Sequence, residues 1–193
     1  MKNFEQEHMY HYDWGTVTAA YWNKYPNLVQ NHIKGIDVID RKIDIDNQTM
    51  KLKRIVHLQY FIPKIFRNIF NIDGRGIAVE DIKVNLKKKK LTIKTVNYTL
   101  APFVNSVEKC TYFQKDGYDN NTFYKQSTQI NITGLGYMKN LIENTILNVI
   151  KEKSKQGIEI MDEVIKRTMN ENIKINQNNI YGNTLNKIQN EKL

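Results

Sequence analysis

The chain is poor in residues on which several common protein classes depend: its 193 residues include one cysteine, three prolines and nine glycines. Cys110 alone can form neither an internal disulfide nor a cysteine-built zinc site. So few prolines and glycines exclude a collagen-like or Pro/Gly-rich disordered chain. No apolar run approaches the about 18 residues that a membrane-spanning helix needs. With 40% hydrophobic residues, this length predicts one globular domain around a single core.

Sequence motifs of the common catalytic and cofactor-binding sites are missing as well. The histidines lack the His-Glu-x-x-His spacing of zinc proteases, and no Gly-x-Ser-x-Gly, Walker or Gly-x-Gly-x-x-Gly motif occurs. We therefore expect no enzymatic activity, no metal site and no cofactor. The first residues have neither the apolar run of a secretory signal nor the Arg-rich, acid-poor composition of a transit peptide, so no presequence is visible and composition alone does not indicate a compartment.

Positive charge is concentrated in one part of the chain. The formal net charge is +9, and residues 51–100, with twelve basic and three acidic side chains, hold the whole excess. Such a field favours a polyanionic partner, either nucleic acid or an anionic lipid surface. No RNP-type aromatic motif, zinc finger or recognition helix accompanies it, which weakens the nucleic-acid alternative. The lysine run 87–90 also fits a solvated hairpin turn.

The spacing of apolar residues in the first two thirds of the chain predicts mainly strands. Asp13 can cap a short helix over residues 14–24, which Tyr25-Pro26-Asn27 ends. β-branched residues then dominate from 33 to 100, and turn sequences divide this stretch into four strands. Three more strands are predicted at 3–10, 103–115 and 122–133. Seven strands with short connections indicate an antiparallel meander.

The last third has a different period. From Tyr137, apolar residues recur every three and four positions, which predicts one long amphipathic helix that ends near Asn172. Gly157 inside this helix indicates a close packing contact or a bend. Residues 174–193 are rich in asparagine. We therefore expect one domain over 1–173, followed by a mostly disordered tail over 174–193.

An amphipathic segment interrupts the predicted strands. Ile62, Ile65, Phe66 and Ile69 fall at helical spacing, and basic side chains lie opposite them. Such a segment can touch a membrane or cover a cavity, and it can equally be a loop packed permanently on the core.

A curved sheet covered by one amphipathic helix can enclose a lipid. In water a diacyl phospholipid exposes about thirty methylenes at ~0.8 kcal/mol each, so a carrier must supply an apolar cavity. An anionic headgroup also needs partly buried cations. Lys24 at a helix end, His32 just beyond it and Arg54 within a strand are suitable residue types, although each also fits an ordinary surface position.

Several sequences resemble the PRELI-domain family, which includes PRELI, Slowmo and Ups proteins. The most specific is Lys-Tyr-Pro-Asn at 24–27, after Trp-x-x-Val-x-x-Ala at 14–20. The similarity continues through 35–44, Arg54, the stretch from Glu108, the Gly134 region and Ser-Lys-Gln-Gly at 154–157, and it spans about residues 1–170.

The resemblance implies an α+β, START-like fold, in which a concave seven-stranded antiparallel sheet, a long C-terminal helix and a short N-terminal helix enclose a lipid pocket. It implies transfer of phosphatidic acid or phosphatidylserine between the outer and inner mitochondrial membranes, within the intermembrane space. The implied partners are the phospholipid, a transiently contacted anionic membrane, and a small helical chaperone with twin cysteine motifs that forms a heterodimer with the chain. No nucleic acid is expected.

The resemblance also implies roles for particular residues. Headgroup binding falls to Lys24, His32, Arg54 and Lys153. Gating and membrane contact fall to Ile62, Pro63, Ile65, Phe66, Ile69 and Phe70. Leu58 and Phe61 stand where some phosphatidic-acid carriers have lysines, so the headgroup remains open. The alternatives are a basic nucleic-acid-binding domain and a structural adaptor for a small partner protein.

Overall fold

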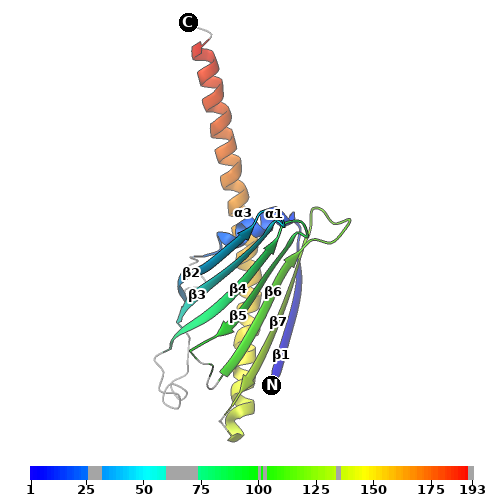
Figure 1. The fold of residues 1–193 in the computed structure, drawn as a ribbon, viewed down its shortest axis with the longest axis vertical. Helices are drawn as coiled ribbons and strands as arrows, with labels where there is room; N and C mark the ends of the chain where they lie inside the picture. Colours follow the sequence, from blue (N-terminus) through cyan, green and yellow to red (C-terminus); the bar gives the residue numbers. More distant parts are fainter. Residues whose placement is uncertain (26–31, 60–73, 100, 102–103, 134–135, 191–193) are drawn as a thin grey trace.

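The computed structural model describes residues 1–25, 32–59, 74–99, 101, 104–133 and 136–190, with side chains to residue 171 except that of residue 138. Within these residues seven strands form one antiparallel sheet in the order β1-β7-β6-β5-β4-β3-β2 (Figure 1). The strands are β1 (Lys2–Tyr10), β2 (Ile33–Asp44), β3 (Thr49–Gln59), β4 (Arg75–Asn85), β5 (Lys90–Asn97), β6 (Val104–Phe113) and β7 (Thr122–Ile132). The predicted seven strands are confirmed.

The sheet is a meander of β2 to β7, and β1 extends it at one edge. From β2 to β7 each strand pairs with the next one along the chain, whereas β1 pairs with β7 at the far edge. Lys87, Lys88 and Lys89 lie in the turn between β4 and β5, and Lys90 begins β5; all four are exposed, as the solvated-hairpin interpretation predicts.

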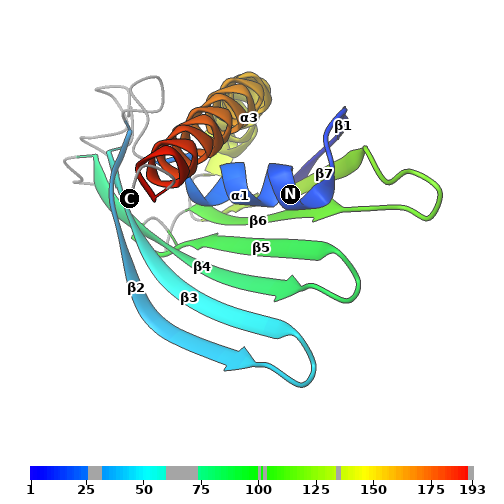
Figure 2. The same ribbon diagram turned by 90° about the horizontal axis from the view of Figure 1, so that it is seen from above.

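Two helices lie on the concave side of the sheet (Figure 2). α1 spans Trp14–Trp22, and the carboxylate of Asp13 accepts the backbone N–H of Thr16 at 3.0 Å, so the predicted cap is confirmed. After a single turn of 3-10 helix, η1 (Gly136–Met138), α3 spans Lys139–Asn190 and crosses the sheet. None of the described helices is long and apolar enough to cross a membrane.

The end of α3 differs from the prediction. The helix continues to Asn190 instead of ending near Asn172, so residues 174–190, which were expected to be mostly disordered, are helical, and the domain boundary at 173 stays a prediction. The physical reason is that residues 174–190 contain no proline and one glycine, Gly182, so that the many asparagines weaken the helix without breaking it.

Side chains that alternate along the strands build two separate apolar clusters under α3. The larger joins α1, Ile160, Met161, Val164 and Ile165 of α3, and inward residues of the sheet such as Leu52, Ile82, Leu91 and Tyr112. The smaller joins Val104, Ile130, Ile132 and Ile142. The middle of α3, around Ser154 and Gly157, lies between them. Burial of these clusters holds the helix on the sheet.

Replacing Ile165 by alanine should lower the free energy of unfolding by about 2–5 kcal/mol, because this side chain is 0% exposed and its loss leaves a cavity. Urea denaturation followed by circular dichroism measures the change. Lys166→Ala, at the neighbouring exposed position, should stay within about 0.5 kcal/mol of the wild type. Equal losses in the two variants would contradict the assigned helix packing.

Candidate functional site

A row of polar side chains crosses the inner face of the sheet between the two apolar clusters. Arg54, Glu80, Thr95, Glu108 and Thr128 are successive register partners from β3 to β7. Directly opposite residues of antiparallel strands point to the same face, so this row faces α3. Polar and charged groups are costly to bury unless they are paired. Their alignment in one row marks this part of the inner face as a site.

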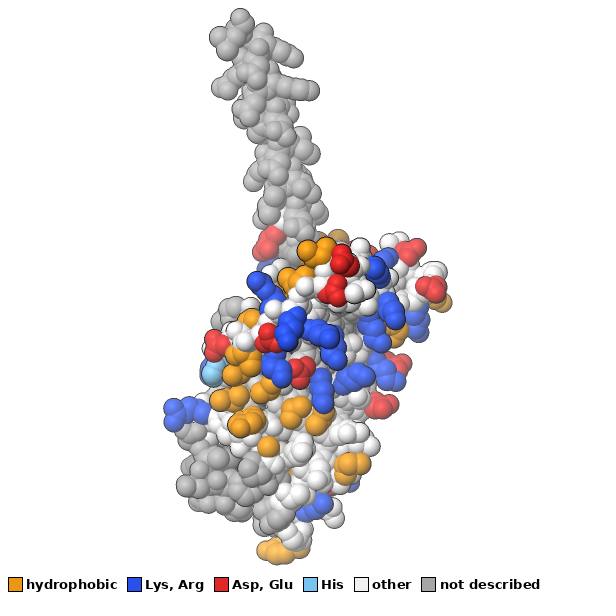
Figure 3. Space-filling model, in the orientation of Figure 1, with side chains coloured by type: hydrophobic (Ala, Val, Ile, Leu, Met, Phe, Trp, Pro, Cys, Tyr) orange, Lys and Arg blue, Asp and Glu red, His pale blue; other side chains and the backbone are white. Residues whose placement is uncertain are grey.

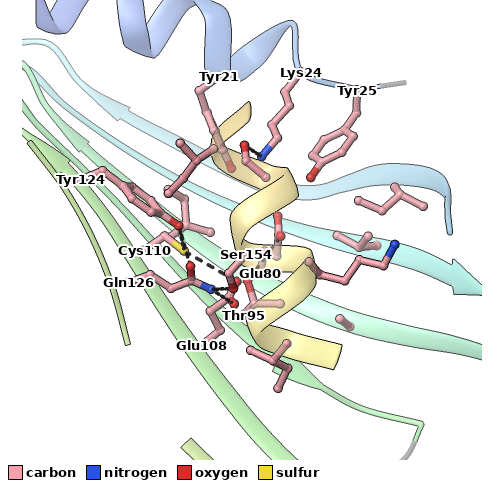
Figure 4. A pocket seen from close by; sticks show the side chains of 18 of the residues that line it. Tyr21, Lys24, Tyr25, Glu80, Thr95, Glu108, Cys110, Tyr124, Gln126 and Ser154 are labelled. Carbon is pink, nitrogen blue, oxygen red and sulfur yellow. Dashed lines mark hydrogen bonds between the residues drawn. The ribbon is translucent and has the colours of Figure 1, made fainter. Parts of the chain in front are cut away.

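A cavity of about 250 Å³ lies over the polar row. Its sheet wall includes Arg54, Glu80, Thr95 and Glu108, and its helix wall includes Lys153, Ser154 and Gly157 of α3. Lys24 and Tyr25 line it from the segment after α1 (Figure 4). Apolar side chains complete the lining, among them Val56, Leu58, Ile150 and Ile158. The cavity therefore combines an apolar rim with several charged groups.

Arg54 is buried and already has a carboxylate partner. The residue is only 8% exposed, and its guanidinium Nε donates to Oε2 of Glu80. One terminal nitrogen donates to the hydroxyl of Tyr21 at 2.7 Å. The interpretation of Arg54 as a solvated surface arginine is therefore wrong. Reversal of its charge would place two carboxylates side by side, so that variant would disturb the fold together with any ligand.

Glu108 is held by neutral donors. Its Oε2 accepts from Gln126 Nε2 at 2.5 Å and from the Thr128 hydroxyl at 3.4 Å, and the thiol of Cys110 lies 3.6 Å from Oε1. Gln126 Nε2 also donates to the Ser154 hydroxyl at 2.9 Å, which links the sheet to α3. Burial raises the pKa of Glu108, and the negative charge of Glu80 adds to the shift. The site thus contains a carboxyl group that is hard to ionise.

Lys24 reaches the cavity from the opposite side. Its Nζ donates to the backbone oxygen of Gly157 at 3.3 Å. Burial lowers the pKa of Lys24, against the opposing effects of Cys110, Glu108 and Glu80. No ion pair to Lys24 forms within the described part of the chain.

His32 and Lys153 complete the set of predicted residues. Burial lowers the pKa of His32, as do the nearby charges of Lys153, Lys34 and Lys24, so the imidazole is neutral at neutral pH. Its Nδ1 is buried and has no hydrogen-bond partner among the described residues. Lys153 is exposed, and its Nζ donates to Gln156 Oε1 at 3.1 Å.

The structure places all four predicted headgroup residues, Lys24, His32, Arg54 and Lys153, around one cavity. The six residues predicted to form the gate, from Ile62 to Phe70, lie outside the described residues.

Sequence reasoning missed the roles of Glu80, Glu108 and Gln126. The available signal was that every second side chain of a strand points to the same face. Glu80 therefore shares the face of buried Ala78 and Ile82, where a carboxylate is unexpected. No cluster of metal-ligating side chains occurs in the described portion.

Comparison with known proteins identifies relatives over most of the chain. The model of the PRELI-like family matches residues 15–172. The protein UPS2, mitochondrial, of Saccharomyces cerevisiae is 28% identical over 168 residues, which cover 86% of this chain and 73% of the yeast protein. The UPS-like protein C36.10 of Schizosaccharomyces pombe is 28% identical over 169 residues, which cover 86% of this chain and 90% of that protein.

Solved structures share the fold at low sequence identity. The Zhui aromatase/cyclase from Streptomyces sp. R1128 superposes with a TM-score of 0.57 and 8% identity, over 86% of this chain and 95% of that one. Norcoclaurine synthase from Thalictrum flavum gives 0.52 and 13%, over 86% and 87%. These are START/Bet v1-like folds, and the predicted START-like architecture is confirmed. At these identities the likeness concerns the fold alone.

Replacing Glu108 by glutamine should raise the thermal midpoint at pH 7 by about 2–4 °C for each kcal/mol gained. Because the folded-state pKa of Glu108 is raised, the folded chain holds this proton more tightly than the unfolded chain, and stability falls as pH rises through the interval between the two values. Calorimetry at several pH values measures this. The gain should shrink towards pH 4; a loss of stability at pH 7 would contradict the assignment.

Proposed function

The chain belongs to the PRELI-like family, and on this premise we propose that it is a non-enzymatic phospholipid carrier. It moves phosphatidic acid or phosphatidylserine between the outer and inner mitochondrial membranes, within the intermembrane space. The mitochondrial name of its yeast relative supports the mitochondrion, and the intermembrane space is part of the proposal. The observation that carries the proposal is the cavity under α3, in which an ammonium group without an ionic partner among the described residues faces a polar row in an otherwise apolar interior.

The size of the cavity indicates which part of the lipid it takes. At about 250 Å³ it is smaller than the about 300–1,000 Å³ pockets that hold drug-sized ligands, so it takes the headgroup of a diacyl phospholipid rather than the whole molecule. The acyl chains then extend past the apolar rim around Ile150 and Ile158 and need a further apolar cover. Residues 62–70, which we propose as the gating and membrane-contact segment, are the candidates for that cover.

Four residues would bind the headgroup. Lys24 supplies an ammonium group for phosphate oxygens, and Lys153 adds a second one at the exposed edge of α3. His32 contributes a neutral ring whose buried Nδ1 lacks a partner among the described residues, so a ligand would satisfy it. Arg54 contributes through the Glu80 pair, because its charge is already compensated. A phosphate here forms charge-assisted hydrogen bonds in a desolvated place.

We also propose a heterodimer with a small helical chaperone that has twin cysteine motifs. The edge strand β2 supports an interface, because it exposes Val38, Ile39 and Ile43 at 59, 52 and 62% of their surfaces. Exposed apolar edge strands favour association unless something covers them. A partner that packs on β2 would remove this surface from water.

Membrane docking is assigned to the outer face of the sheet. Figure 3 shows basic side chains gathered over this face, beside an apolar area. Lys51 and Lys83 are directly opposite in the register, and both are exposed. Like charges in opposite positions destabilise a sheet, so an anionic partner gives this arrangement a function. The lipid surface is favoured over nucleic acid because the cavity calls for a membrane source of ligand.

Replacing Lys24 by glutamine should slow the transfer of fluorescent phosphatidic acid and phosphatidylserine between liposomes about tenfold, because the phosphate loses a charge-assisted hydrogen bond. Fluorescence dequenching measures the rates. Lys166→Gln removes the same charge from an exposed position on α3 and should transfer at the wild-type rate. Equal rates in two folded variants would argue against headgroup binding at Lys24.

Replacing both Lys51 and Lys83 by glutamine should weaken binding to anionic vesicles about 30-fold, since each lysine near such a surface contributes about 1 kcal/mol. Vesicle co-sedimentation at two salt concentrations measures it. The double variant Lys155→Gln, Lys166→Gln loses the same charge from α3 and should bind as the wild type. If both double variants bind equally weakly, net charge and not this face directs docking. Tighter binding of the wild type to RNA than to the vesicles would favour the nucleic-acid alternative.

A further inference from the structure

The polar row holds more acidic than basic side chains. Arg54 supplies one guanidinium, whereas Glu80 and Glu108 supply two carboxyl groups. Arg54 pairs with Glu80, which also accepts from the Thr95 hydroxyl at 3.4 Å. The row therefore has one ion pair and one further carboxyl group, that of Glu108. A site that bound only phosphate would not require the second carboxyl group, that of Glu108.

The direct hydrogen-bond donors of Glu108 are polar but uncharged. Gln126, Thr128 and Cys110 provide its hydrogen bonds, from β7 and from β6 itself. No ion pair to Glu108 forms among the residues that the structure describes. A desolvated carboxylate without a direct ion pair is unfavourable, and burial raises the pKa of this group by more than the charge of Lys24 lowers it. A cation that enters the cavity would stabilise the ionised form.

Lys24 and Glu108 form a complementary pair: each shifts the pKa of the other towards the charged form, although burial has the larger effect on both. Figure 4 shows Lys24 descending from the α1 side and Glu108 on the sheet wall, on different sides of the cavity. The bonds of Lys24 and Glu108 run to Gly157 and Gln126 respectively, and no direct bond joins the two side chains. One site for an anion and one for a cation therefore line the same cavity. A dipolar ligand fits such a pair better than a simple anion does.

We propose that Glu108 is a specificity-determining residue that accepts the primary ammonium group of a phospholipid headgroup while Lys24 binds its phosphate. The ligand class is an aminophospholipid, and phosphatidic acid, which has no ammonium group, is the disfavoured substrate. This inference rests on the proposed function and deepens it. Gln126 and Thr128 orient the carboxylate, and Ser154 connects that arrangement to α3.

The first test changes the ligand and leaves the protein intact. The full wild-type chain is assayed with liposomes that contain acyl-labelled phosphatidylserine, its N-acetylated derivative or phosphatidic acid. N-acetylation removes the ammonium group and retains the phosphate and the serine carboxylate. We expect phosphatidylserine to move about tenfold faster than either of the other two lipids, the factor typical of one charged hydrogen bond. Equal rates for phosphatidylserine and its N-acetyl derivative would overturn the inference.

The second test changes the protein. Glu108→Gln keeps the shape of the side chain and removes its charge, and it should reduce the preference for phosphatidylserine over the N-acetyl derivative to within twofold. Glu163→Gln makes the same change at an exposed position of α3 outside the cavity and should keep the preference. A preserved preference in folded Glu108→Gln would overturn the role of Glu108.

The two tests separate this inference from the proposed function. If the wild type transfers all three lipids without preference, the carrier assignment stands and the role of Glu108 is refuted. If the wild type transfers none of them, the carrier assignment fails and the inference fails with it. A preference that Glu108→Gln abolishes supports both.

Discussion

One helix has to cover the inner face of seven strands, and the rest of the structure follows from that constraint. Strands about 4.8 Å apart make a face roughly 30 Å wide, whereas a helix with its side chains is about 10–12 Å across. The sheet therefore curls around α3, and α1 covers a further part (Figure 2). Apolar contact is concentrated in two clusters, and between them a cavity remains.

That cavity is where the sheet departs from an ordinary apolar interior. Arg54, Glu80 and Glu108 stand in one transverse row, which a core selected for stability alone would fill with aliphatic residues. START/Bet v1-like proteins with unrelated chemistry share the same architecture. Proteins that share this fold therefore differ in the side chains that line the cavity. In this chain the lining includes acidic and basic side chains, and not all of them form ion pairs with one another.

Most of the fold could be predicted from the sequence, because the strand and helix periods are regular and Asp13 is a strong cap. The length of α3 could not, since an asparagine-rich stretch without proline leaves helix and disorder close in free energy. Lys24, His32, Arg54 and Lys153 were found through the family resemblance, and the cavity indeed joins them. The Arg54–Glu80 pair was missed because its partners lie 26 positions apart, and only the register of β3 and β4 brings them together.

The most direct test of the carrier assignment is a structure of the full chain with a short-chain phosphatidylserine bound. The account predicts that the headgroup lies over the polar row, with a phosphate oxygen within hydrogen-bond distance of Lys24 Nζ and the ammonium group beside Glu108. A headgroup bound elsewhere, with this cavity unchanged, would contradict it.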